Sequence, residues 1–399
     1  MTAEHFISEA GYPQELHTVT TDDGYILHLH RVPRRCAKKT VFFQHGVLDT
    51  SLGWVCSNAT DSLAFAAWDE GCDVWLGNSR SNPPRRHTDP KIPNDQYWSY
   101  TLNELGMKDV GAQLQHIHTI KCQELQNQVT STEPIHISRS EGHLSDKGDD
   151  SSPYSLTLVG HSLGAAALLI YLVTSLHFGG ECHRVQRLIL MSPAGFHPVF
   201  PPVVLPLLWL LPPLTWSMER LMGRRGAALM IPGSFGRLFF FKIFQDAVQY
   251  PAIREFVKRS IRLLMNGDVS PWEFAMQLPH YDVNSMPGIS VHSGIHLIQI
   301  VRSGRFQLFD YGSAEKNRLH YGQSTPIDIA GEYGKIDVPV DIVAGRNDGV
   351  IPPECVQRHV RHMEEQGVDV SYREFDYGHL EFSATVGHDL QSYILERIA

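Results

Sequence analysis

The stretch "TLVGHSLGAAALLIYL", residues 157–172, places a serine between two glycines where a run of β-formers gives way to an apolar helix. Its residues 160–164, Gly-His-Ser-Leu-Gly, fit the pattern G-x-S-x-G, in which a tight strand-to-helix turn excludes side chains at the flanking positions. Such a turn exposes the serine at the edge of a sheet, so we interpret Ser162 as a nucleophile. The alternative is a serine that only caps the helix.

A nucleophilic serine on such a turn needs an acid and a base that follow later in the chain. Asp348 lies in "VAGRNDGVIP" just after a strand expected at 338–345, and His379 lies in "DYGHLEFS" just after the last expected strand. We predict that His379 takes the hydroxyl proton of Ser162 and that Asp348 orients the imidazole. Otherwise, Asp348 is a turn residue before a glycine, and His379 is one surface histidine among the 22 of the chain.

An oxyanion site requires two backbone N–H groups beside the nucleophile. Leu163, the residue after Ser162, begins a helix and would supply one of them. Val47 would supply the other, because it follows "TVFFQHG" (residues 40–46), a short apolar strand that ends at a glycine. The alternative is that Gly46 is an ordinary loop glycine and that Val47 has no such role.

Short apolar runs, separated by helical stretches, predict buried strands along most of the chain. These runs are residues 40–46, 73–78, 155–160, 185–193, 338–345 and 370–378. The alternation predicts an α/β fold, with a mostly parallel sheet flanked by helices. We assign residues 1–194 and 336–399 to this core, and residues 195–335, whose proline-rich and amphipathic pieces break the alternation, to an inserted helical cap. The polar residues 127–153 form a predicted surface insertion.

Composition argues against several classes of protein. The formal net charge is −9 and no basic repeat occurs, which argues against a nucleic-acid partner. The six cysteines lack C-x-x-C spacing, and no carboxylate or cysteine accompanies the paired histidines at ligand spacing, so we expect neither a metal nor another cofactor. The N-terminus has no basic region followed by an apolar run, so we predict no secretory signal and expect a cytoplasmic protein.

The expected cap contains two strongly apolar pieces. Residues 198–216 are uncharged and long enough to cross a membrane, but six prolines would break a spanning helix, so we predict no transmembrane segment. "GRLFFFKIF" (236–244) adds aromatics flanked by Arg237 and Lys242. Both pieces suit peripheral contact with a membrane or a lipid droplet. The alternative is that they pack on the core and on each other.

Several longer segments carry a family resemblance. "FFQHGVLDTSLGWV", "DVWLGNSR", "LVGHSLGA", "SGRFQLFDYG" and "VAGRNDGVIPP" resemble the acid-lipase family, the eukaryotic α/β-hydrolase group that includes gastric and lysosomal acid lipases. The chain looks most similar to the plant lipase-like members. It departs from gastric and lysosomal members at Leu163, where they carry glutamine, but the expected role there belongs to the backbone.

The resemblance implies an α/β-hydrolase fold and hydrolysis of lipid esters, such as triacylglycerols or steryl esters, through an acyl-enzyme on Ser162. It implies that Asp348 and His379 complete the triad, that the Val47 and Leu163 amides bind the oxyanion, and that a cap covers the site. An acyltransferase with the same triad is the nearest alternative. A non-catalytic lipid-binding protein is another, although all three triad positions are filled.

Overall fold

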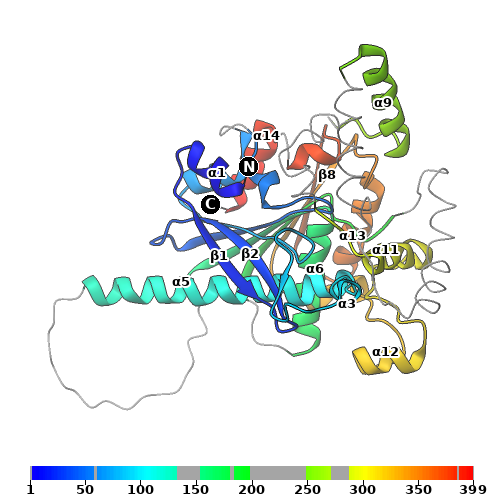
Figure 1. The fold of residues 1–399 in the computed structure, drawn as a ribbon, viewed down its shortest axis with the longest axis horizontal. Helices are drawn as coiled ribbons and strands as arrows, with labels where there is room; N and C mark the ends of the chain where they lie inside the picture. Colours follow the sequence, from blue (N-terminus) through cyan, green and yellow to red (C-terminus); the bar gives the residue numbers. More distant parts are fainter. Residues whose placement is uncertain are drawn as a thin grey trace.

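The computed structural model describes residues 2–57, 61–132, 153–179, 184–197, 249–270, 287–383 and 386–398. Within these residues nine strands form one sheet, in the order β1-β2-β4-β3-β6-β7-β8-β9, with β5 paired to β2 (Figure 1). The strands are β1 (Glu15–Thr20), β2 (Tyr25–Val32), β3 (Lys39–Gln44), β4 (Asp73–Leu76), β5 (Arg86–His87), β6 (Ser155–His161), β7 (Val185–Met191), β8 (Val340–Gly345) and β9 (Val370–Phe375).

Neighbouring strands run parallel from β4 to β9, whereas β1, β2 and β5 are joined antiparallel. The parallel part contains all six strands predicted from the apolar runs, so the predicted fold class is confirmed. The helices are α1 (Ala3–Glu9), α2 (Leu63–Asp69), α3 (Asn94–Tyr97), α4 (Leu102–Glu104), α5 (Gly111–Thr132), α6 (Leu163–His177), α9 (Pro251–Leu264), α11 (Val291–Ser303), α12 (Ala314–Tyr321), α13 (Pro353–Glu365) and α14 (His388–Ile398).

Both faces of the sheet are buried, because successive side chains of a strand point to opposite faces. On β3, Phe42 belongs to one apolar core, and Val41 and Phe43 belong to the other. The first core includes side chains of α5, α6 and α13, and the second includes those of α1, α2 and α14 (Figure 1). The parallel strands therefore lie between two helical layers and end at one common edge, where loops can build a site.

Two predicted insertions are described in part. Helix α5 continues to Thr132, so the first residues of the polar insertion predicted at 127–153 are helical, whereas residues 133–152 lie outside the described ranges. Of the predicted cap, residues 195–197, 249–270 and 287–335 are described. The last of these ranges contributes Ile300 and Phe306 to the first core. The division into core and cap stays a prediction.

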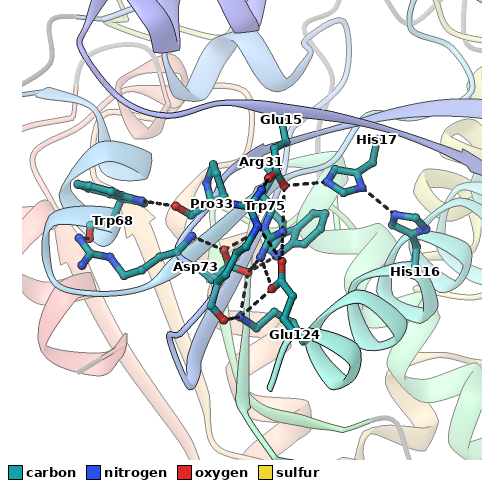
Figure 2. Close-up of polar contacts among 12 residues, drawn as sticks. Glu15, His17, Arg31, Pro33, Trp68, Asp73, Trp75, His116 and Glu124 are labelled. Carbon is teal, nitrogen blue, oxygen red and sulfur yellow. Dashed lines mark hydrogen bonds and ion pairs between the residues drawn. The ribbon is translucent and has the colours of Figure 1, made fainter. Parts of the chain in front are cut away.

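A buried network of charged side chains holds α5 against the antiparallel strands (Figure 2). Arg31 of β2 donates to both carboxylate oxygens of Asp73 at 3.0 Å and to Glu124 of α5. Lys121 is fully buried, 3.4 Å from Asp73 and 3.5 Å from Glu124. Arg31 also donates to Glu15 at 2.9 Å. Two cations therefore face three carboxylates, and these ion pairs stabilise a helix whose sequence is mainly polar.

Replacing Arg31 with methionine would leave the Asp73 and Glu124 carboxylates without their main cation. We expect the free energy of unfolding to fall by about 3–5 kcal/mol, the cost of breaking a buried ion pair from one side. Arg35→Met is the matched control, because Arg35 also contacts Glu124 but its side chain is 60% exposed, so its loss should cost less than about 1 kcal/mol. Urea unfolding followed by circular dichroism measures both values, and equal losses would contradict the role of the network.

Candidate active site

The predicted nucleophile lies on a sharp turn between β6 and α6. Ser162 has φ 54° and ψ −122°, a strained backbone conformation for a residue with a side chain. A Cβ atom at Gly160 would lie 2.7 Å from the Cα of Ala165. A Cβ atom at Gly164 would collide with the carbonyl oxygen of His45. The turn thus requires glycine at both positions, which is the steric reason for the G-x-S-x-G pattern.

The structure brings the three predicted triad residues together. The Ser162 hydroxyl lies 2.9 Å from Nε2 of His379, and Nδ1 of the same ring lies 2.8 Å from Oδ2 of Asp348. Asp348 follows β8 and His379 follows β9, so both loops lie at the sheet edge where β6 ends. All three side chains are buried. In this arrangement Nδ1 donates to the carboxylate, and Nε2 can accept the serine proton.

Asp348 and His379 shift each other's pKa values, so that the carboxylate is ionised and the imidazole is a stronger base. Burial alone would lower the pKa of His379, but the adjacent Asp348 carboxylate raises it. For Asp348, burial alone would raise the pKa, and the His379 charge lowers it instead. The Asp348 carboxylate also accepts the N–H groups of Val350 at 2.9 Å and Ile351 at 2.7 Å, which hold it in one orientation.

The two predicted oxyanion donors lie on either side of the serine. Leu163 begins α6 directly after Ser162. Gly46, in the loop after β3, lies so close that its Cβ atom would be 3.0 Å from the Cβ of Ser162, and Val47 follows it. Val47 and Leu163 both line a cavity of about 30 Å³, and within the described ranges neither N–H group donates to another residue. Their role in binding an oxyanion stays a prediction.

Comparisons with known proteins agree with this geometry. Residues 3–58 match the family model of a partial alpha/beta-hydrolase lipase region. Gastric triacylglycerol lipase of Rattus norvegicus is 26% identical over 370 residues, which cover 89% of this chain and 81% of that one. Lysosomal acid lipase/cholesteryl ester hydrolase of Macaca fascicularis is 28% identical over 340 residues, which cover 82% of this chain and 73% of that one. The chain therefore resembles the acid lipases along most of its length.

A solved structure supports the fold of this chain. The structure of DcsB in complex with its substrate analogue has a TM-score of 0.53 and 14% sequence identity, and the likeness covers 97% of this chain and 99% of that one. Such a likeness shows the shared fold alone. The fold class predicted from the sequence is confirmed, and the relatives agree with the family resemblance seen in the sequence.

His161 is a residue of the candidate site that the sequence analysis did not assign. Its Nε2 donates to the carbonyl oxygen of His379 at 3.0 Å, and the two ring centres are 4.8 Å apart. Burial and the neighbouring His379 lower the pKa of His161 to about 3, so its ring is neutral. A neutral ring adds no second positive charge beside His379. Its place inside the motif was the only signal that could have found it.

A buried carboxylate of the predicted cap also reaches the site. Oδ2 of Asp268 accepts the N–H groups of His379 at 2.9 Å and Gly349 at 3.0 Å, and the residue is 1% exposed. The sequence analysis missed it because "NGDVSP" (266–271) reads as an ordinary turn between helices. Asp268 therefore connects the loop of Asp348 and the loop of His379 with the predicted cap.

We predict that the His379 imidazole titrates above the ordinary value of about 6.5, and that Asp348→Asn lowers its pKa because the amide has no negative charge. Nitrogen-15 NMR of histidine-labelled protein measures the titration, and the His379 signal is assigned from its absence in His379→Gln. Asp376→Asn is the control, because Asp376 lies near the base loop but is 77% exposed, so the pKa should not move. Identical titrations of wild type and Asp348→Asn would contradict this electrostatic assignment.

Proposed function

We propose that this chain is a serine hydrolase that cleaves carboxylic ester bonds of lipids through an acyl-enzyme on Ser162. The observation that carries the proposal is the chain of hydrogen bonds from Ser162 to His379 at 2.9 Å and from His379 to Asp348 at 2.8 Å. The relatives named triacylglycerol lipase and cholesteryl ester hydrolase support lipid esters as the class of substrate.

In the proposed mechanism, Oγ of Ser162 attacks the ester carbonyl carbon while Nε2 of His379 takes its proton. Asp348 stabilises the imidazolium, and the Val47 and Leu163 N–H groups donate to the oxyanion. The intermediate then expels the alcohol, which takes the proton from Nε2, and the acyl group stays on Ser162. Water attacks this ester with His379 again as the base, which releases the fatty acid and restores the serine.

Ser162→Ala should lower ester turnover by about 10⁶-fold, because the variant lacks the hydroxyl that His379 activates as the nucleophile. The assay is hydrolysis of p-nitrophenyl esters of several chain lengths, beside covalent labelling with a fluorophosphonate. Ser155→Ala, which changes a half-buried serine at the start of β6, far along the strand from Ser162, should keep full turnover and labelling. Absence of labelling in folded wild type, with detergent or lipid present, would contradict a serine hydrolase.

We also propose that α9 is a surface for contact with lipid. Its apolar side chains are exposed: Ile253 is 41%, Phe256 is 70% and Leu263 is 73% exposed. Its other face carries four basic residues and one acidic residue, although the whole chain has a net charge of −9. Figure 1 shows α9 standing away from the sheet. An apolar face beside basic side chains suits the headgroup region of an anionic lipid surface.

This surface differs from the one expected from the sequence. The apolar pieces at 198–216 and 236–244 lie outside the described residues, whereas α9 was not singled out. In the part of the chain that the structure describes, none of the helices combines the length and the apolar character that crossing a bilayer requires. The proposed contact is therefore carried by an amphipathic helix that lies along the lipid surface.

The double variant Phe256→Ser/Leu263→Ser should bind vesicles with 30% phosphatidylglycerol at least tenfold more weakly, since each lost side chain removes about 1.5–3 kcal/mol of apolar burial. Co-sedimentation with the vesicles measures binding. The matched control is Leu319→Ser, because Leu319 is 84% exposed on α12, outside any apolar helix face. Equal binding of the double variant and wild type would rule α9 out as the contact surface.

A further inference from the structure

The end of α9 continues into a segment that packs tightly on two loops of the site. A Cβ atom at Gly349 would lie 2.6 Å from the backbone nitrogen of Asp268 and would collide with the carbonyl oxygen of Met265. A Cβ atom at Gly378 would lie 2.5 Å from Oγ of Ser270. The backbone of residues 265–270 therefore lies directly against the loops that carry the acid and the base.

Hydrogen bonds fasten this segment to both loops. Oδ2 of Asp268 accepts the N–H groups of Gly349 and His379, and Oδ1 accepts the N–H group of Ser270 at 2.9 Å. Oγ of Ser270 in turn accepts the N–H group of Leu380 at 2.9 Å. Each of these contacts of Asp268 comes from an N–H donor, which is the pattern that an ionised carboxylate accepts.

We propose that Asp268 is a positioning residue of the triad, through which the cap holds the Asp348 loop and the His379 loop at the separation that catalysis requires. This inference rests on the proposed function. Gly349 is the neighbour of Asp348, and the other bond goes to the backbone of His379 itself. One buried carboxylate therefore sets the places of two triad members that come from different strands, and does so from a segment outside the sheet.

The charge of Asp268 acts on the imidazole as well as on the backbone. The titratable groups near the His379 ring are Asp348 at Nδ1, the neutral ring of His161 and the half-buried His197. Desolvation and His379 lower the pKa of His197 to about 4. Asp268 is the second carboxylate of this set, and it raises the pKa of His379 in addition to Asp348. Loss of its charge should therefore lower that pKa.

Asp268→Asn is the decisive variant, because it removes the charge and leaves a single acceptor oxygen, so its NH₂ group must face either the N–H group of Ser270 or those of Gly349 and His379. We expect kcat for a soluble short-chain ester to fall about 10- to 100-fold, the effect of a small displacement of catalytic groups. The acidic limb of the kcat/KM profile should move to lower pH, because His379 without this carboxylate loses its proton at lower pH. A residue that served only stability would leave the limb in place.

Two further variants separate charge from position. Ser270→Ala removes only the bond to Leu380, so kcat should fall by about two- to tenfold while the acidic limb stays at its wild-type pH. Asp376→Asn removes an exposed carboxylate near the same loop and should change neither value. Circular dichroism and thermal unfolding confirm that each variant is folded at the assay temperature. If Asp268→Asn does not fold, the Ser270→Ala rate decides, and wild-type kcat in that variant overturns the proposal.

For folded Asp268→Asn, either a wild-type kcat or an unmoved acidic limb would overturn the proposal. Failure of the proposed function has a different signature, since wild type itself would then show neither ester turnover nor fluorophosphonate labelling. A wild type that turns over esters, beside an Asp268→Asn variant that matches it, refutes the positioning role alone.

Discussion

The close approach of backbone to backbone around Ser162 is the constraint on which the site depends. Gly164 lets α6 begin against the end of β3, and Gly46 lets the loop after β3 pass beside the serine. Side chains at these places would separate the neighbouring strands β3 and β6, which pair in parallel up to Gly160. The positive φ of Ser162 persists because the residues around it are fixed by packing: Leu163 lies in one apolar core and Val159 in the other.

At that turn, burial lowers the pKa of a histidine unless a neighbouring carboxylate offsets it. His161 and His379 are both buried, and their ring centres are 4.8 Å apart. His379 has Asp348 at its Nδ1 and Asp268 at its backbone, so its pKa is raised. His161 donates to a carbonyl oxygen, and its pKa is lowered to about 3. Of two buried histidines, the one beside carboxylates can therefore act as a base, and the other stays neutral.

The parallel strands and the triad positions could be predicted from the sequence, because both follow from short local patterns. Apolar runs located the parallel strands, and the order of strands then placed Asp348 and His379 at the edge where Ser162 lies. Asp268 could not be found in this way, because it bonds to a residue 111 positions away and no motif surrounds it. The extension of α5 into residues 127–132 could not be predicted either, because a mainly polar helix leaves no apolar period in the sequence.

Residues 265–270 of the predicted cap also limit the movement that lipid contact through α9 could cause. A bound surface shifts a conformational equilibrium only by its difference in affinity for the two states. The segment after α9 is bonded to both triad loops, and Gly349 and Gly378 leave no space for it to move inward. Displacing it would break those bonds and disturb His379. Lipid contact through α9 is therefore better suited to orient the triad toward the surface than to open the site by moving this segment.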